Sequence, residues 1–304
     1  MLINMMMEVV IYQDIKRNKM KTGFIISAYI IILTLIIYYI CYALDFGVFS
    51  IVFALIASIS SAWGSYYYSD KIVLRINNAR PATEEENKRL IDILDALMVS
   101  SGLPTKPKLY IMESDQPNAF ATGRDPNHSV ICVTTALLDK LDYYELEGVV
   151  AHEMGHIKNY DIRLSAVLTV MVGLVIILSD FFSRAFLWGR FDDDDNGSNA
   201  LMVLISIILL MLAAFFGKLM KLAISRKREF MADATAVEFT RNPDALISAL
   251  EKLDSDTSKL KQANNSTENM YIVTPFKGKQ KKANNWFSTH PSIEDRIEAI
   301  RTLR

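Results

Sequence analysis

Cysteine, histidine and net charge are all scarce in this chain of 304 residues. Two cysteines exclude a disulfide-rich secreted scaffold, and the apolar neighbours of Cys41 and Cys132 indicate small buried side chains in a reducing compartment. A net charge of −1 excludes a dominant nucleic-acid interface, because phosphate binding requires a positive excess. Charged residues make up 22% of the chain against 51% hydrophobic residues. The apolar residues therefore either fill a large soluble core or form membrane-spanning runs.

The first two apolar runs predict a transmembrane hairpin at residues 22–69. No residue is charged between Lys21 and Asp45, a stretch long enough to cross about 30 Å of hydrocarbon as a helix. The second uncharged run ends in Trp63 and three tyrosines, which favour the lipid headgroup boundary. Because no small-residue cleavage site follows the first run, we interpret it as a retained anchor and not as a signal peptide.

Two later runs, 164–179 and 196–217, predict two further transmembrane helices, which makes up to four in all. The second of these is long enough to span the membrane, whereas the first is short and a buried or re-entrant helix is its alternative. The connector between them contains the acidic run Asp192–Asp195. We interpret this run as a solvated outer loop, because the glycine and glutamate of a calcium-binding EF-hand loop are missing.

Basic residues cluster on one predicted side of the membrane. They flank the first, second and fourth runs, whereas the predicted outer connections are acidic. Translocation of Lys and Arg is disfavoured, so this asymmetry predicts the orientation. The N-terminal tail 1–21, both termini and the polar segments 70–163 and 218–304 are expected in the cytoplasm.

The two polar segments predict one divided domain of mixed α and β structure. Thr83 and Glu86 form a capping box ahead of a helix. Short β-rich stretches follow at 108–112 and 130–134, with Pro, Gly and Asn between them that mark turns. Further helices are expected from Asp142, around 225–242 and from Ser292, and residues 255–285 suggest a mobile loop. The expected fold is a mainly α membrane protein that carries an α+β domain.

His152, Glu153 and His156 form the pattern His-Glu-x-x-His. Two imidazoles at i and i+4 lie on one helical face about 5–6 Å apart, where they can bind zinc while Glu153 reaches its water. A random chain of this length shows the pattern on the order of 1% of the time. Unpartnered histidines on so apolar a helix would also be costly. We therefore predict a zinc site on this helix.

A hydrolytic zinc site needs a third protein ligand and one open position. No histidine in 157–163 completes the extended metzincin pattern. Glu229 and Asp233 are again i and i+4, so Glu229 can bind the metal while Asp233 accepts a hydrogen bond from a liganding imidazole. On spacing alone, a surface ion pair of Glu229 with Arg226 or Arg228 is equally compatible.

At four separated stretches the chain resembles the HtpX-type bacterial membrane zinc metalloproteases. In the arrangement of their metal ligands these are related to the CAAX prenyl proteases and the gluzincins. These stretches are AHEMGHIKNYD at 151–161, SRKREFMADATA at 225–236, PNAFATG at 117–123 and STHPSIEDRI at 288–297. The resemblance covers nearly the whole chain. It implies a zincin-like catalytic domain with a small β-sheet, a cleft-edge strand and one zinc ion per subunit.

The resemblance also implies roles for the metal-site residues. His152, His156 and Glu229 would be the zinc ligands, and Glu153 the general base. Asp233 would be the carboxylate that supports a ligand.

Other stretches would contact the substrate. The backbone around Asn118, Ala119, Phe120 and Ala121 would pair with an extended substrate at the cleft edge. His290 would support the transition state, with a histidine packed at a helix start as the alternative. Arg296 would either orient a carboxylate or lie on the surface.

The function implied is that of a zinc endopeptidase in the bacterial inner membrane. It would cleave misfolded or damaged membrane proteins at the cytoplasmic face as part of a stress response. Its partners would be unfolded or membrane polypeptides and the lipid bilayer, without nucleic acid. One alternative is a CAAX-type processing protease with a defined substrate, which a chamber of many spans would favour. Another is a membrane scaffold with structural zinc, which a fourth protein ligand would indicate.

Overall fold

The computed structural model describes residues 2–43, 46–187, 226–258, 260, 267–275 and 291–303, with isolated positions at 204, 207–208, 211–212 and 215. The acidic run Asp192–Asp195 and His290 lie outside these residues, as does the predicted fourth apolar run except at the isolated positions. The elements below therefore concern the hairpin, the third apolar helix and most of both polar segments.

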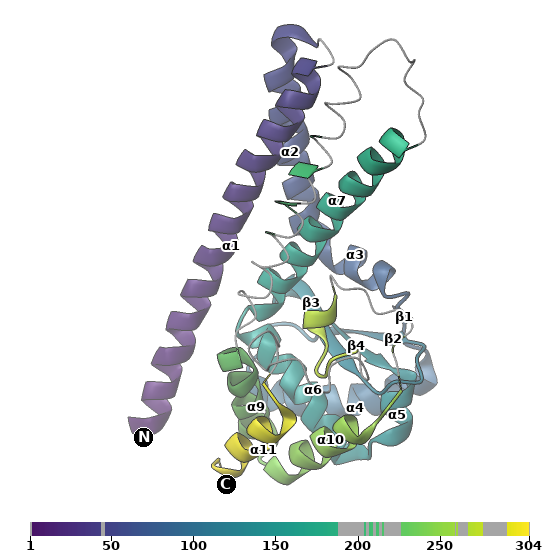
Figure 1. Cartoon of the computed structure of the whole chain (residues 1–304). Helices are drawn as coiled ribbons and strands as arrows, with labels where there is room; N and C mark the ends of the chain where they lie inside the picture. The colour runs from purple at the N-terminus through teal and green to yellow at the C-terminus, as the bar shows by residue number, and fades with distance from the viewer. Residues whose placement is uncertain are drawn as a thin grey trace.

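Three long apolar helices stand together above a globular part that contains the sheet (Figure 1). They are α1 (Leu2–Ala43), α2 (Ser50–Tyr67) and α7 (Asp161–Leu187), with a short 3-10 helix, η1 (Gly47–Phe49), between the first two. Each contains a segment long and apolar enough to cross a membrane: Asn18–Tyr42, Gly47–Tyr67 and Asp161–Asp180. The first two of these segments overlap the two apolar runs of the predicted hairpin. The third run, short in the sequence analysis, belongs to a helix of 27 residues.

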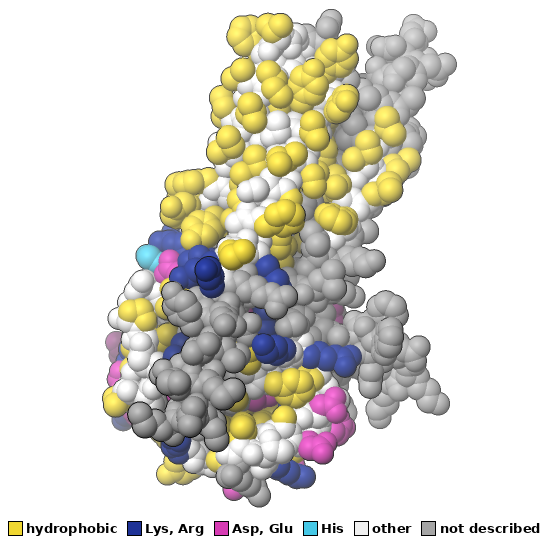
Figure 2. Space-filling view, turned by 90° about the vertical axis from the view of Figure 1, so that its left-hand side faces the viewer, with side chains coloured by type: hydrophobic (Ala, Val, Ile, Leu, Met, Phe, Trp, Pro, Cys, Tyr) yellow, Lys and Arg dark blue, Asp and Glu magenta, His cyan; other side chains and the backbone are white. Residues whose placement is uncertain are grey.

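Small and hydroxyl side chains join the first two helices. The buried residues of α2 recur every three or four positions and are all Ala or Ser, a pattern that allows close helix approach in membranes. Thr34 and Ser58 are hydrogen-bonded at 2.5 Å, and Tyr29 and Ser61 at 2.9 Å. The outward-facing side chains are large and apolar. Figure 2 shows them as a column with Lys and Arg directly beneath it.

The globular part is built on a four-stranded mixed sheet of order β1-β2-β4-β3. Its strands are β1 (Arg80–Pro81), β2 (Lys108–Met112), β3 (Ala119–Asp125) and β4 (His128–Thr134). The sequence predicts β2 and β4, which pair in parallel, and β3 is antiparallel to β4 at the edge. Residues 119–125, read as turn-rich from their composition, are thus a strand, as the family resemblance implies. β3 has a bulge at Gly123, where the backbone passes very close to the His128 carbonyl. A Cβ atom on residue 123 would collide with that carbonyl oxygen.

Helices cover the sheet and enclose the main core. They are α3 (Ser69–Ile76), α4 (Glu84–Ser101), α5 (Thr135–Lys140), α6 (Tyr143–Lys158), α9 (Arg226–Thr240), α10 (Pro243–Ser255) and α11 (Ile293–Arg301), with a short 3-10 helix, η2 (Glu268–Met270). The predicted capping box of Thr83 and Glu86 begins α4, and Gly102 ends it in the left-handed conformation. Fully buried Leu90, Val149 and Leu250 belong to one core between the sheet and α4, α6, α9 and α10.

Helix α6 leads from this core to the base of the third apolar helix. A capping box of Asp142 and Glu145 begins it, and it ends at Lys158. Tyr160 then adopts a positive φ of 60°, and α7 begins at the next residue, Asp161. The His-Glu-x-x-His pattern therefore lies within one turn of chain from a membrane-capable helix.

Candidate metal centre

Two crossing helices position the predicted metal residues. His152, Glu153 and His156 are on α6, and Glu229 is on the first turn of α9. The helices approach closely at Gly155, where a Cβ would lie only 3.3 Å from backbone atoms of Ala232. A larger residue in place of Gly155 would push α9, and with it the third ligand, away from the histidines.

The three predicted ligands converge on one point. Their donor atoms all lie within 4.8 Å of one another. The Nε2 atoms of His152 and His156 are 3.2 Å apart, close to the about 3.3 Å expected for two nitrogens bound tetrahedrally at about 2.0–2.1 Å from zinc. Glu229 oxygens lie 3.8 Å from the first of these nitrogens and 3.7 Å from the second. Glu229 is buried beside both imidazoles and is not a surface residue.

Glu153 has the environment of a group that serves a bound water. Its Oε1 atom is buried and has no hydrogen-bond partner, which is costly unless a ligand or water completes the site. It lines a cavity of about 30 Å³ together with His156 and Glu229, which is room for a water molecule. The three-ligand set and the unsatisfied oxygen both fit a divalent metal with one open position.

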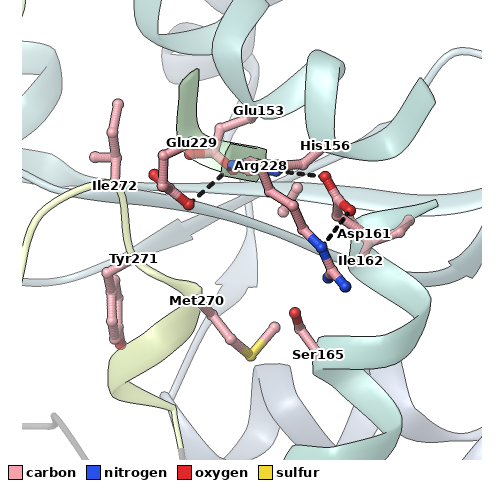
Figure 3. Close-up of a pocket in the computed structure, with 11 residues that line it drawn as sticks. Glu153, His156, Asp161, Ile162, Ser165, Arg228, Glu229, Met270, Tyr271 and Ile272 are labelled. Carbon is pink, nitrogen blue, oxygen red and sulfur yellow. Dashed lines mark hydrogen bonds and ion pairs between the residues drawn. The ribbon is translucent and has the colours of Figure 1, made fainter. Parts of the chain in front are cut away.

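Each imidazole is held from behind by a carboxylate. Asp233 Oδ1 lies 2.9 Å from Nδ1 of His152, as the i, i+4 spacing predicts. Asp161 Oδ2 lies 3.1 Å from Nδ1 of His156. Asp161 also accepts a hydrogen bond of 2.9 Å from Asn18 of α1. It forms an ion pair with Arg228 as well, as Figure 3 shows. Such carboxylates fix ring orientation and leave the outer nitrogen free for metal.

Arg296 ties the centre to the C-terminal helix. Its side chain is fully buried and donates two hydrogen bonds to Asp233, at 2.9 and 2.7 Å. A third goes to the carbonyl of Ile272 at 3.0 Å. Of the two roles open to Arg296 in the sequence, orientation of a carboxylate is thus the one observed.

Burial and neighbouring charges shift the pKa values of Glu153, His152 and His156 in different directions. Burial raises the pKa of Glu153 to about 7, with Glu229 adding to the shift and His156 opposing it. Burial also lowers the pKa of His152 despite Asp233, which favours the neutral form that binds metal. For His156, burial is outweighed by the hydrogen bond to Asp161 and the charge of Glu229, so its pKa rises to about 9. The carboxylates that favour a proton there also favour a divalent cation.

A segment of the chain itself lies along the predicted substrate edge. Tyr271–Val273, here called the strap, forms an antiparallel bridge between Tyr271 and Phe120 of β3. The Ile272 amide donates to the Ala119 carbonyl at 3.0 Å, and Asn118 Nδ2 donates to the Val273 carbonyl at 2.9 Å. Figure 3 shows Met270, Tyr271 and Ile272 along one side of the metal cavity. This part of the predicted mobile loop is therefore fixed, because β3 offers it an unpaired edge.

The described residues bring together every predicted site residue except His290, which lies outside them. Sequence reasoning missed three contributors, namely Asp161, Asn18 and the strap. Asp161 follows His156 by five residues across a turn, so helical spacing does not reveal the contact. The signals in the sequence were its position directly before an apolar run and its place at the end of the stretch 151–161 that carries the family resemblance.

Comparisons with known proteins identify the family of the chain. Residues 84–304 match the family model for peptidase family M48. A protein named Protease HtpX homolog from Dictyoglomus thermophilum is 44% identical over 96% of this chain and 94% of its own length. Another of that name from Listeria innocua is 38% identical over 96% of this chain and 100% of its own. The crystal structure of S. mikatae Ste24p covers 96% of this chain and 67% of that chain, at 18% identity and a TM-score of 0.47. The chain belongs to peptidase family M48 and is an HtpX-type membrane metallopeptidase.

Proposed function

We propose that the protein is a zinc-dependent endopeptidase that cleaves misfolded or damaged membrane proteins at the cytoplasmic face of the bacterial inner membrane, as quality control under stress. The observation that carries the proposal is the convergence of His152, His156 and Glu229 beside the unsatisfied carboxylate of Glu153. Among the described residues this group has three members and no fourth. That composition favours a catalytic site over a structural one.

Zinc suits the two imidazoles and one carboxylate, and when bound it would lower the pKa of a water and polarise the scissile carbonyl. Glu153 would accept the proton of the attacking water at its free Oε1 atom and return it to the leaving amine. A pKa of about 7 matches this exchange, because the carboxyl can gain and lose a proton near neutral pH.

An extended peptide is the substrate shape that fits the site. β3 is the edge strand beside the cavity. The backbone of the strap donates to the Ala119 carbonyl and accepts from the side-chain amide of Asn118, which an extended substrate could also do. A substrate would take the place of the strap and pair with β3 in the same way. Main-chain hydrogen bonds depend little on the identity of the side chains. We therefore expect the enzyme to prefer unfolded segments in general over one defined sequence.

The membrane location follows from the position of the site. Asp161, Ile162 and Ser165 at the base of α7 line the cavity, so the site lies beside a membrane-capable helix. Basic residues on either side of the hairpin support a cytoplasmic placement of the globular part. Membrane proteins with exposed unfolded segments would reach such a site first.

The test is to restore zinc to protein purified in chelator. With zinc, the wild-type chain should cleave itself and an added unfolded polypeptide, whereas Glu153→Gln should be slower by at least about 100-fold at the same zinc content. Glu251→Gln on the exposed face of α10 is the matched control and should remain active. Full activity of Glu153→Gln would overturn the proposal.

A further inference from the structure

A second cavity lies where the hairpin joins the globular part. It has a volume of about 360 Å³ and shares no lining residue with the metal cavity. The end of α2, the start of α3, the loop before β2 and the turn between β3 and β4 enclose it. Its size lies in the range of small-molecule sites, and no role in peptide cleavage requires it.

The lining is strongly basic. Four cationic side chains, Lys71, Lys106, Lys108 and Arg124, face a single lining carboxylate, Asp70. Two of the cations have acidic neighbours just outside the lining. Lys106 pairs with Asp95 at 2.6 Å, and Arg124 lies 3.8 Å from Asp125.

Lys71 and Lys108 leave the cavity with uncompensated positive charge. In the part of the chain that the structure describes, neither lysine forms an ion pair. Lys71 instead lies over the ring of Tyr68, 5.4 Å from its centroid. Asp70 can balance only one of these two lysines, so the lining keeps a net positive charge and an anion in the cavity would be bound favourably.

Aromatic side chains place the cavity at the membrane surface. Trp63 and Tyr67 line it, and Tyr67 is the last residue of the second membrane-capable segment. Rings of this kind favour the headgroup level of a bilayer. Arg124 is held against this belt, because its guanidinium lies 5.2 Å from the Tyr67 ring centroid and donates to the Tyr67 carbonyl at 3.5 Å. We therefore expect Arg124 to lie near the depth of lipid phosphates.

We propose that this cavity binds a phosphate group, carried by an anionic phospholipid of the leaflet at which the globular part lies. The lysines supply charge and the guanidinium of Arg124 supplies a fork of donors suited to phosphate oxygens. A free phosphate ion shares this chemistry. The lipid is favoured because Trp63 and Tyr67 would pack against its glycerol and acyl region, which a soluble ion lacks.

The bound lipid would brace the catalytic part against the membrane. Arg124 lies near one end of β3, and the other end, at Ala119, carries the predicted substrate edge. Arg163 of α7 donates to the Arg124 carbonyl at 2.6 Å, which joins this end of β3 to the third apolar helix. A ligand between α2 and the β3–β4 turn would hold the edge strand at a constant height above the bilayer.

The experiment measures lipid binding to the full chain by native mass spectrometry in neutral detergent. The chain carries Glu153→Gln to prevent self-cleavage. Phosphatidylglycerol is titrated against the Lys71→Gln/Lys108→Gln variant and a matched control, Lys88→Gln/Arg301→Gln, whose exposed cations lie on α4 and α11. At about fivefold for each cation near an anionic lipid, the loss of two cations should lower the affinity of the cavity variant about 25-fold, and that of the control less than twofold.

Two further arms identify the source of the phosphate. Phosphatidylcholine, which has no net charge, should bind weakly and equally to both variants. Failure of millimolar inorganic phosphate to displace phosphatidylglycerol supports the lipid. Displacement by inorganic phosphate at equal concentration supports the phosphate site but assigns it a soluble ligand. Equal phosphatidylglycerol affinity in the cavity variant and the control would overturn the proposal.

Discussion

At the scale of residues, the metal centre is defined by what lies behind its ligands. His152 is oriented by Asp233, which Arg296 holds through two hydrogen bonds. His156 is oriented by Asp161, which comes from a different helix and receives a hydrogen bond from Asn18 of α1. One imidazole is therefore supported from within the globular part and the other from the membrane helices.

Asp161→Asn should weaken metal binding more than it weakens the fold. The amide keeps the size of the side chain but loses the charge that aligns His156, so the Kd for zinc should rise about 10- to 100-fold. Competition with a chelating dye measures this Kd, and thermal unfolding of the metal-free protein monitors the fold. Asp180→Asn, on the exposed part of the same helix, is the control. An unchanged zinc Kd would show that Asp161 does not support His156 in metal binding.

At the scale of elements, α6 depends on a buried carboxylate at its start. Glu145 caps its own helix through the Asp142 amide, and it accepts 2.6 Å hydrogen bonds from Ser248 and Lys252 of α10. Burial alone would raise the pKa of Glu145, but these bonds outweigh it and lower the pKa below its ordinary value of 4.5. The ionised form therefore stabilises the junction of α6 and α10.

The sign of this shift predicts a pH dependence. A lowered pKa in the folded state contributes stability above pH 4.5, and this contribution is lost as the pH falls through the folded pKa. Glu145→Gln should therefore lose about 1–2 kcal/mol of unfolding free energy at pH 7, and the difference from wild type should shrink in acid. Thermal melts across pH measure this, with Glu251→Gln as an exposed control. A difference that grew in acid would contradict it.

The strap is the element whose position bears most directly on substrate entry. Tyr271 packs edge-to-face on Phe120 with centroids 5.4 Å apart, and its hydroxyl donates to Asn77 Oδ1 at 2.7 Å. These contacts hold the strap on the edge of β3 that a substrate would use.

Tyr271→Phe should make the strap easier to displace. The variant keeps the ring but removes one buried hydrogen bond of about 1 kcal/mol, so the apparent KM for an unfolded substrate should fall up to about fivefold. Peptide cleavage kinetics measure it, and Tyr144→Phe at the exposed start of α6 serves as control. A raised KM would instead mean that the strap helps to position the substrate.

At the scale of the whole molecule, the catalytic part and the membrane part share residues. The chain passes from His156 through one turn into α7, and Asn18 of α1 reaches back to the Asn159 carbonyl and Asp161. A movement of the apolar helices α1 and α7 would therefore shift the residues that support the metal ligands. The metal centre is thus connected, through the chain and through hydrogen bonds, to helices that are long and apolar enough to cross a membrane.

Local spacing in the sequence predicted the pairs of site residues that lie on one helix. It could not predict contacts between residues that are far apart in the sequence. The i, i+4 period brought out His152 with His156 and Glu229 with Asp233. The contact of Arg296 with Asp233 joins residues 63 positions apart, and that of Asn118 with Val273 joins residues 155 apart. Such pairs follow from tertiary packing, which leaves no periodic signal. Short elements such as β1, with two residues, were missed for lack of a pattern.

The most direct test of the account is the zinc content of purified protein, measured with cleavage activity in the same sample. Wild type should hold one zinc ion per chain and cleave an unfolded polypeptide. Glu153→Gln should keep the zinc and lose cleavage, whereas Glu229→Ala should lose both, because one of the three ligands is gone. Unchanged zinc in Glu229→Ala would place the third ligand elsewhere and contradict the metal centre described above.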